Sequence, residues 1–171
     1  YFLSNNKSTN LIQSNLIGIH NYKNISLAIL ASLQAKVSLT RCIKAIESFK
    51  GVKRRMEFMG TKEHMMIFDD FAHHPTEIAS SIKSLKGEYK NKKILSICEI
   101  KSNSMISGAH KINLPKALNT SHASIIVRSP LSKWSLMDNT IHIVNDYKKV
   151  IDYINKNKYK IDIILIMSNK S

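Results

Sequence analysis

Hydrophobic residues recur every three or four positions in two stretches near the start of the chain. This spacing predicts a first helix over residues 21–35 and a second helix that starts after Ser38 and stops before Gly51. A short entry strand is expected over residues 16–19, ahead of the first helix. Residues 1–50 are therefore expected to form a mainly helical part.

After Gly51 the pattern changes to short apolar runs that alternate with amphipathic stretches. Pro75 suits the first turn of a helix that ends near Gly87, and Asp146 suits the N-cap of a later helix. A short helix is also expected over residues 114–118. Strands are expected over residues 55–59 and 64–68, with a turn at Gly60, and over residues 93–97, 124–128, 141–144 and 161–167.

Strands that alternate with helices predict parallel βαβ units, so residues 51–171 are expected to form an α/β domain with a mostly parallel sheet flanked by helices. The last strand is nearly all apolar, as expected for a strand that is covered on both faces. Ligands of such sheets bind at the carboxyl ends of the strands. Four polar segments are thereby placed on one functional edge, at residues 69–74, 99–105, 128–133 and 168–169.

The chain carries 26 Lys and Arg residues against 12 Asp and Glu residues, a formal net charge of +14. Such a charge is typical of proteins that bind nucleic acid, and it suits phosphate-bearing small molecules equally well. The Lys residues are scattered, and their densest groups, at 90–93 and 156–160, are not interleaved with stacking aromatic residues. A basic nucleic-acid-binding module therefore remains an alternative only, and no nucleic-acid partner is expected.

Cys42 and Cys98 stand alone, without a Cys-x-x-Cys pair, so neither a disulfide framework nor a zinc ribbon is expected. Unpaired cysteines fit a reducing, cytoplasmic location. The longest apolar run, residues 163–167, is far too short to span a bilayer, and no signal peptide is visible, so no membrane partner is expected. The chain begins with Tyr1, and we expect it to be a fragment of a longer protein whose oligomeric state is open.

The densest polar cluster is Asp-Asp-Phe-Ala-His-His-Pro at residues 69–75, between a predicted strand and a predicted helix. The carboxylates of Asp69 and Asp70 suit ribose hydroxyls or water-bound Mg²⁺, and His73 suits a phosphate or a carboxylate. The alternative is a capped turn, in which these side chains satisfy backbone groups at the helix start. A zinc site at His73 and His74 is disfavoured because no third ligand is evident, and no metal ligand is assigned.

Three further polar clusters lie at predicted element boundaries. Gly-Ile-His-Asn-Tyr-Lys-Asn at residues 18–24 offers Asn side chains, which suit either an adenine edge or simple N-capping. Lys-Arg-Arg-Met-Glu at residues 53–57 offers a basic pair, which suits either phosphates or a solvated turn. Glu-Ile-Lys-Ser-Asn-Ser-Met at residues 99–105 is polar and follows directly on a predicted strand.

In this order, Gly-x-His-Asn-x-x-Asn, Arg-Arg-x-Glu and Asp-Asp-Phe-Ala-His-His-Pro-Thr resemble the carboxyl-terminal part of the Mur ligases, in the branch that binds N-acetylmuramate. Each of these motifs alone is weak evidence for the resemblance. The seven-residue string from Asp69 to Pro75, with the other motifs at suitable spacing, is specific for this family. The resemblance covers about residues 16–169. It implies a Rossmann-like closing domain over residues 51–171, expected to be truncated, preceded by the end of the central ATP-binding domain over residues 1–50.

The resemblance also implies an ATP-dependent ligase that forms an amide bond through an acyl phosphate, with ATP and Mg²⁺ as cofactors. Its substrates would be UDP-N-acetylmuramate and an amine, which is either the murein tripeptide L-alanyl-γ-D-glutamyl-meso-diaminopimelate of peptidoglycan recycling or free L-alanine. Residues 99–105 and the ending Ile-Met-Ser-Asn are more similar to the tripeptide-adding members. The alanine-adding members usually carry Gly at the position of Ala72, and they remain the second possibility.

Residue roles follow from the resemblance alone. The adenine site would be lined by His20, Asn21 and Asn24. Arg54 or Arg55 would neutralise phosphate charge, and Asp69 or Asp70 would hold the ribose. His73 would be catalytic, near the reacting carboxylate or the incoming amine. The residues that face the tripeptide would be Lys101, Ser102 and Asn103.

The sequence also departs from the family pattern. Lys101 stands where the family has Arg, which removes bidentate recognition of a carboxylate, and Ile100 replaces Pro, which leaves the loop less constrained. The chain contains no Gly-x-x-x-x-Gly-Lys-Ser/Thr phosphate-binding loop. We therefore expect most Mg²⁺ ligands to lie in the rest of the central domain, and we expect this chain alone not to catalyse ligation.

Overall fold

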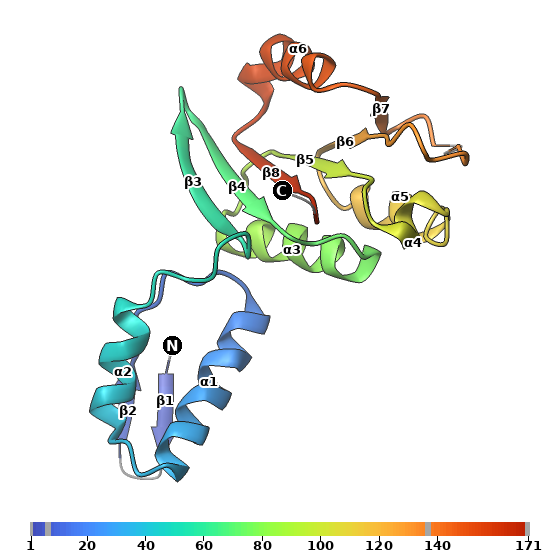
Figure 1. Cartoon of the computed structure of the whole chain (residues 1–171). Helices are drawn as coiled ribbons and strands as arrows, with labels where there is room; N and C mark the ends of the chain where they lie inside the picture. Colours follow the sequence, from blue (N-terminus) through green and yellow to red (C-terminus); the bar gives the residue numbers. More distant parts are fainter. Residues whose placement is uncertain (1, 6–7, 136–137, 170–171) are drawn as a thin grey trace. The chain divides into compact units, whose positions relative to one another are not determined.

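The computed structural model describes residues 2–5, 8–135 and 138–169. The chain divides into two compact units, Tyr1–Val52 and Lys53–Ser171, whose elements are labelled in Figure 1. No helix in the described ranges is long and apolar enough to cross a membrane. The assignment of the two units to separate domains of a larger ligase stays a prediction.

The first unit combines a strand hairpin with two helices. Its elements are β1 (Phe2–Asn5), β2 (Ser8–Leu11), α1 (Ile19–Gln34) and α2 (Leu39–Ser48). Strands β1 and β2 pair antiparallel, and both helices lie where the hydrophobic spacing predicts them. The entry strand expected over residues 16–19 is wrong, because Gly18, at φ 99°, starts α1 and leaves Ile19 already helical.

The apolar core of the first unit is small. Ile25 and Ile29, one turn apart on α1, pack with Ile12 and with Cys42 of α2. Other large apolar side chains of α1 stay exposed, and Leu27 keeps 65% of its surface accessible. A core of this size is typical of part of a larger domain, because few apolar groups are removed from water.

The second unit is the predicted α/β domain. Its elements are β3 (Glu57–Lys62), β4 (Met65–Asp70), α3 (Pro75–Glu88), β5 (Ile94–Glu99), α4 (Asn103–Ile106), α5 (Asn113–Leu118), β6 (Ala123–Val127), β7 (His142–Val144), α6 (Tyr147–Asn157), the 3₁₀ turn η1 (Lys158–Lys160) and β8 (Ile163–Met167). The alternation of strands and helices expected from the sequence is confirmed. Helix α4 and the 3₁₀ turn η1 are the elements of this unit that the hydrophobic pattern does not reveal, because each is only about one turn long.

The six strands form one sheet in the order β3-β4-β8-β5-β6-β7. Strand β3 is antiparallel to β4, and the other neighbours are parallel. Strand β8, the last in the chain, lies between β4 and β5, where Leu165 is opposite Phe68 on one side and Ser96 on the other. Four of its five residues are buried, which confirms that this apolar strand is covered on both faces.

Helices cover the two faces of this sheet (Figure 1). On one face α3 buries Ile78, Ile82 and Leu85. At the end of α3, the ring of Tyr89 packs against the ring of Phe68 in β4, with 5.8 Å between the two ring centroids. On the other face Val150 of α6 belongs to a cluster with side chains of the central strands. That cluster includes Leu95, Ile97, Ile125, Val127 and Ile164. The alternation of side chains along each strand therefore supplies two separate apolar layers.

The turn between β3 and β4 differs from the sequence prediction. The turn predicted at Gly60 is wrong: β3 continues to Lys62, and the chain reverses at Glu63 and His64, where Glu63 has φ 55°. Gly60, at φ 129°, instead lies where the pairing of β3 with β4 shifts register. Glycine permits that conformation, so here it marks a bulge and not a turn.

Truncation of a β8 side chain at the sheet centre should test the importance of this strand. Leu165 is fully buried and Ile166, its neighbour, is 38% exposed. Leu165→Ala should lower the free energy of unfolding by about 2–5 kcal/mol, because it opens a cavity in a packed core. Ile166→Ala is the matched control and should cost roughly 1 kcal/mol or less. Urea unfolding followed by circular dichroism measures both, and equal losses would contradict the central placement.

Candidate active site

The carboxyl ends of β4, β8, β5 and β6 meet at one edge of the sheet, here called the carboxyl rim. Its segments are residues 69–74, 99–105, 128–133 and 168–169. Because the four strands are parallel and paired in register, these segments share an edge, as the sequence predicts. The side chains of the rim are therefore the candidates for ligand binding.

An ion pair and two hydrogen bonds connect the ends of three strands. Arg54 Nε pairs with Asp69 Oδ2 at 3.2 Å, and Arg54 Nη2 donates to the carbonyl oxygen of Ser168. Ser168 Oγ donates to Glu99 Oε2 at 2.6 Å. Asp69 ends β4, Ser168 follows β8 and Glu99 ends β5, so the network runs across the middle of the rim.

Glu99 is the centre of this network. Its carboxylate also accepts hydrogen bonds from Lys101 Nζ, at 2.8 Å, and from the Tyr147 hydroxyl. Burial raises the pKa of the Glu99 carboxyl, but the hydrogen bonds from Lys101, Ser168 and Tyr147 outweigh burial and lower that pKa below its ordinary value. Contact with Glu99 in turn raises the pKa of the Lys101 ammonium. The pair is therefore held ionised.

Asp70 has a structural task that its neighbour Asp69 lacks. Its carboxylate is buried, with Oδ2 accepting the backbone N–H of Met56 at 2.8 Å and Oδ1 that of Ala72 at 2.7 Å. These bonds fix the loop on both sides of the rim. The side chain of Asp69 keeps 22% of its surface accessible, so of the two predicted ribose ligands Asp69 is the one within reach of solvent.

The Arg-Arg-x-Glu segment forms a strained turn. Arg54 and Met56 adopt φ values of 58° and 51°, a left-handed conformation that costs roughly 1 kcal/mol or more for a residue with a side chain. Glu57 Oε2 accepts the N–H of Arg54 at 2.7 Å, and the Arg54 carbonyl accepts the N–H of Phe71 at 2.7 Å. These contacts hold the turn against the rim.

Phe71 orders both arginines. The guanidinium groups of Arg54 and Arg55 lie 5.4 Å and 5.5 Å from the centroid of its ring, within the range of a cation–π interaction. Two positive charges are thereby kept together beside Asp69. The structure thus brings the predicted phosphate-neutralising residues into one group with a predicted ribose ligand.

The two histidines of the motif have different roles at the start of α3. His74 is the N-cap, and its Nδ1 accepts the N–H of Thr76. His73 Nδ1 lies 3.1 Å from the carbonyl oxygen of Phe71, which can only accept, so Nδ1–H donates and the neutral ring carries its lone pair on Nε2. The side chain of His73 is 31% exposed. His73 therefore offers Nε2 as a proton acceptor at the rim.

Glu77 completes the helix start. Its Oε2 accepts the backbone N–H groups of His73, at 3.2 Å, and His74, at 3.3 Å. Burial raises the pKa of the Glu77 carboxyl, but these backbone hydrogen bonds lower it below its ordinary value. The capped turn weighed as an alternative from the sequence is therefore present, and it positions His73 at the same time.

The three residues predicted to face the tripeptide differ in availability. The ammonium of Lys101 is bound to Glu99 and lies 3.3 Å from the Tyr147 hydroxyl. Ser102 is the N-cap of α4, where its hydroxyl accepts the N–H of Met105 at 3.3 Å. Asn103 is exposed on the first turn of that helix. Of the three, Asn103 is the side chain that protein contacts occupy least.

The predicted adenine residues all belong to the first unit. His20 and Asn24 are exposed one turn apart on α1, so they share a face of that helix. Asn21 Nδ2 donates to the carbonyl oxygen of Ile17 at 2.8 Å, which stabilises the helix start. The structure therefore groups His20 with Asn24, whereas the amide of Asn21 is already engaged.

A self-contained metal site does not form in the described part of the chain, where no three His, Cys, Asp or Glu side chains are grouped to hold an ion. Asp70 is occupied by backbone N–H groups, Asp69 pairs with Arg54, and the ring of His74 packs against His110 at 4.5 Å. Asp69 alone does not make a Mg²⁺ site, so any such ion would need ligands from outside these residues.

Sequence analysis placed Phe71 and Ser168 in segments of the rim without giving either a role, and it did not mention Tyr147. Tyr147 and Ser168 bind Glu99, and Phe71 orders the arginines. Ser168 follows directly on the last apolar strand, and that position was the available signal. Tyr147 gives no comparable signal, because it is brought to Glu99 by a helix whose tilt the sequence does not specify.

Known proteins are similar to this chain in sequence and in fold. Residues 54–170 match the family model described as "Mur ligase, glutamate ligase domain". Because that match covers most of the second unit and more than half of the chain, the chain belongs to the Mur ligase family.

Two groups of sequence relatives match different lengths of the chain. A UDP-N-acetylmuramate–L-alanyl-γ-D-glutamyl-meso-2,6-diaminoheptandioate ligase from Haemophilus influenzae is 30% identical over 94% of the chain. A UDP-N-acetylmuramate–L-alanine ligase from Hydrogenobaculum sp. is 42% identical, but over 50% of the chain. The chain spans 37% of the first relative and 19% of the second.

A solved structure resembles the chain over almost its whole length. The crystal structure of a murein peptide ligase from Psychrobacter arcticus aligns with 96% of this chain at 29% identity and a TM-score of 0.66. The alignment covers 37% of that protein.

Protonation of Glu99 should weaken the second unit. Its pKa is lower in the folded protein than in the unfolded chain, so the stability it contributes is present above the unfolded pKa of about 4.3 and is lost as pH falls through the folded value. Glu99→Gln should cost about 1.5–3 kcal/mol at neutral pH and flatten the acid limb of the stability curve. Glu88→Gln, at an exposed site, is the matched control. Urea midpoints from pH 3 to pH 7 measure the effect, and parallel curves for Glu99→Gln and the unmodified chain would contradict it.

Proposed function

We propose that the chain is part of a ligase that joins UDP-N-acetylmuramate to L-alanyl-γ-D-glutamyl-meso-diaminopimelate in peptidoglycan recycling. The observation that carries this proposal is the extent of the matches. A ligase named for this tripeptide matches 94% of the chain, whereas the more identical L-alanine ligase matches half of it. Addition of L-alanine is the second candidate, because identity is higher where that relative does match.

Within this proposal residues 1–50 are the end of a central ATP-binding domain, and residues 51–171 are most of the closing domain. The small core of the first unit and its exposed apolar side chains on α1 support the assignment to part of a larger domain. The matched relatives are about two to three times longer than this chain, which leaves room for a phosphate-binding loop. Sequencing of the adjoining gene tests this arrangement, and an upstream frame without such a loop would overturn it.

The proposed reaction has two steps. In the first, an oxygen of the lactyl carboxylate of UDP-N-acetylmuramate would attack the γ-phosphorus of ATP, and ADP would leave with the electron pair of the broken P–O bond. The L-alanine nitrogen of the tripeptide then attacks the acyl carbon, the C–N bond forms, and phosphate leaves with the electron pair of the C–O bond. The protein contributes by positioning the groups and neutralising their charge.

The rim residues suit these tasks. Arg54 and Arg55, grouped over Phe71, keep two positive charges together, and these charges would neutralise phosphate charge. Asp69 offers a carboxylate for ribose hydroxyls. His73, with its lone pair on Nε2, would accept the proton that the attacking amine gives up. His20, Asn21 and Asn24 would contact adenine, and Mg²⁺ would be held mostly by residues outside this chain.

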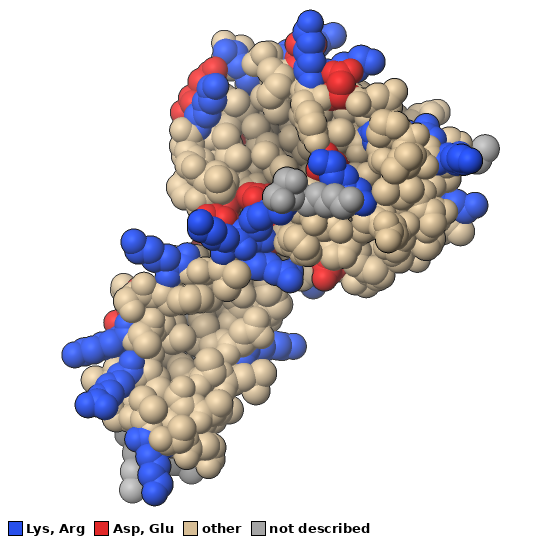
Figure 2. All heavy atoms as spheres, viewed as in Figure 1, with Lys and Arg blue, Asp and Glu red and all other residues tan. Residues whose placement is uncertain are grey.

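A cytoplasmic location and small-molecule partners belong to the same proposal. The alternative of a nucleic-acid-binding module has weaker support. On the face drawn in Figure 2, one group of Lys and Arg side chains near the middle of the view has Asp or Glu beside it, and the other Lys and Arg side chains protrude at separate points. A nucleic-acid interface would need a continuous basic surface and would bind with a steep salt dependence.

Replacement of the accessible aspartate should affect nucleotide binding in the full-length protein. Asp69→Asn should raise the KM for ATP about tenfold, because a neutral amide binds ribose hydroxyls less strongly than a carboxylate. Asp152→Asn, at an exposed site on α6, is the control. An unchanged KM for Asp69→Asn would remove the ribose role, whereas a fall in melting temperature alone would make Asp69 structural through Arg54.

The choice of amine should be visible in turnover. The full-length protein should consume ATP with the tripeptide at a kcat/KM at least about a hundredfold above that with free L-alanine, since the peptide offers more contacts at the transition state. Release of inorganic phosphate with each amine measures this ratio. A ratio in favour of L-alanine would select the second candidate.

A further inference from the structure

The start of α3 and the turn that follows α4 meet at two histidine rings. The ring of His74 lies edge-to-face with the ring of His110, with 4.5 Å between the ring centroids. His74 is the N-cap of α3, and His110 belongs to the turn of residues 107–112 between α4 and α5. We call the two rings the His74–His110 pair.

His74 can cap α3 only while its ring is neutral. Its Nδ1 accepts the backbone N–H of Thr76 and lies 2.8 Å from the Thr76 hydroxyl. A protonated Nδ1 donates and no longer accepts, so a proton on His74 removes the cap. The positive end of the helix dipole also disfavours a charge on this ring. The first proton of the pair therefore belongs on His110.

Neither ring of the pair has a counter-charge. Within residues 2–5, 8–135 and 138–169, no carboxylate forms an ion pair with His74 or His110. The neighbouring His73 differs, because its Nδ1 lies 3.7 Å from Glu77 Oε2. Burial lowers the pKa of the His110 ring, and the charges of His74 and His73 lower that pKa further.

The other charged groups around the pair do not offset this effect. On the side of α3 the Glu77 carboxylate is shared between backbone N–H groups and the nearby charges of His73 and Arg55. On the side of the turn the residue after His110 is Lys111, a second cation. Two charged rings in this position would therefore repel each other without a nearby anion to hold them.

The neighbours of His110 in the turn are exposed. Ala109, Lys111 and Ile112 all face solvent, and Ile112 keeps 66% of its surface accessible. Buried packing resumes at Leu114 in α5. The exposed neighbours add little to the packing of the turn on α3, so the ring of His110 is important for the position of the turn.

We propose that His110 is a positioning residue that holds the turn after α4 to the start of α3, and that double protonation of the His74–His110 pair breaks this contact. For the reaction the inference rests on the proposed function, in which His73 accepts a proton and Asn103 faces the tripeptide. His73 directly precedes the N-cap of α3, and Asn103 begins α4. Acid therefore separates two parts of the rim that must act together.

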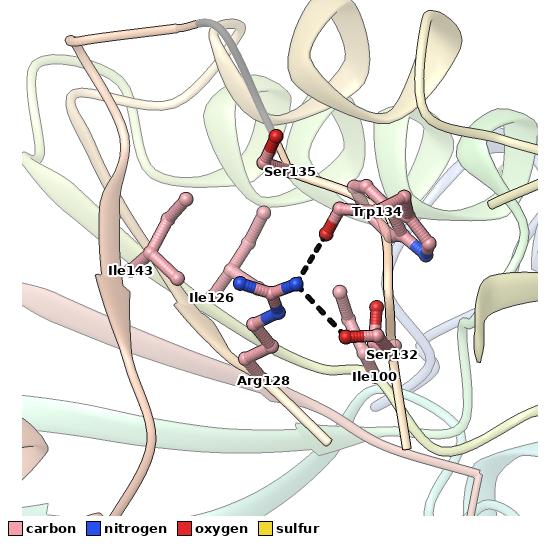
Figure 3. Close-up of a pocket in the computed structure, with 7 residues that line it drawn as sticks. All are labelled: Ile100, Ile126, Arg128, Ser132, Trp134, Ser135 and Ile143. Carbon is pink, nitrogen blue, oxygen red and sulfur yellow. Dashed lines mark hydrogen bonds between the residues drawn. The ribbon is translucent and has the colours of Figure 1, made fainter. Parts of the chain in front are cut away.

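The single tryptophan of the chain reports on this turn. A Cβ on Gly108 would lie 2.7 Å from Trp134 Cδ1, so the indole lies directly against the turn. The indole Nε1 also donates to the carbonyl oxygen of Met105 in α4, at 2.7 Å. From its own loop, Arg128 Nη2 donates to the carbonyl oxygen of Trp134 at 2.6 Å (Figure 3). Trp134 is thus fixed independently of His110, and a change at its indole reports movement of the turn.

Acid titration of the intact chain tests the contact. From about pH 7.5 to about pH 5, Trp134 fluorescence and the indole N–H signal in NMR should change with a midpoint below 6.5, the ordinary pKa of histidine. Far-ultraviolet circular dichroism should show that the chain stays folded. His110→Phe keeps an aromatic ring that takes up no proton, so the change should be lost.

Three further variants support the titration. His142→Phe is the matched control, because the ring of His142 contacts Tyr153 on the edge strand β7, with 4.6 Å between centroids; the Trp134 change should persist in it. His110→Gln, which also takes up no proton, replaces His110→Phe if that variant does not fold. His74→Asn can still cap α3, and it should raise the pKa of the His110 ring by removing a neighbouring charge.

The pH profile of the full-length ligase tests the role in the reaction. At acid pH, log(kcat/KM) should fall with a slope steeper than about one per pH unit, because His73 and the pair all take up protons. In His110→Phe the slope should return to about one. A merely structural role of His110 would lower the rate at every pH and leave the slope unchanged.

Each result has a separate meaning. A Trp134 change that persists in His110→Phe, or a His110 ring signal that does not respond to His74→Asn, would overturn the acid-sensitive contact. Equal slopes in the two full-length proteins would overturn the positioning role in the reaction, even where the Trp134 change depends on His110. A full-length protein without ligase activity would count against the proposed function, and the titration of the intact chain would still decide the contact.

Discussion

Irregular backbone at the carboxyl rim leaves N–H groups without helix or strand partners, and carboxylates accept them. The Asp70 carboxylate accepts the N–H groups of Met56 and Ala72, and the Glu57 carboxylate accepts the N–H of Arg54. The Glu77 carboxylate accepts the N–H groups at the start of α3. A buried N–H without an acceptor is costly, so the turn at residues 54–57 and the loop at residues 70–77 depend on these carboxylates. At the rim Asp70, Glu57 and Glu77 act in this way, and the loops that they hold keep Asp69 and the arginines in place.

The fold could be predicted from sequence wherever one local signal decides the conformation. Apolar period and turn residues located the sheet strands and the long helices of the second unit, and Pro75 marked the start of α3. The failures occurred where one residue admits two conformations. Gly18 was compatible with a strand or a helix start, and Gly60 with a turn or a bulge. In each case pairing or packing with distant residues made the choice.

The site was predictable as a set of segments and less so as a set of contacts. Parallel topology alone brought residues 69–74, 99–105 and 168–169 together. The different roles of Asp69 and Asp70 could not be predicted from two adjacent residues of the same type. The roles depend on which side of β4 each carboxylate faces. The contact of Tyr147 with Glu99 depends on how α6 packs on the sheet, which short-range patterns do not encode.

The position of β8 has a consequence for synthesis of the protein. Before residues 163–167 leave the ribosome, β4 and β5 have no strand between them, so the sheet exists at most as two separate pieces with exposed edges. Pairings between residues about a hundred positions apart must then form together, which is slow compared with local folding. The nascent chain therefore stays open to degradation and aggregation until residues 163–167 emerge, and termination before residue 163 removes the strand that unites the sheet.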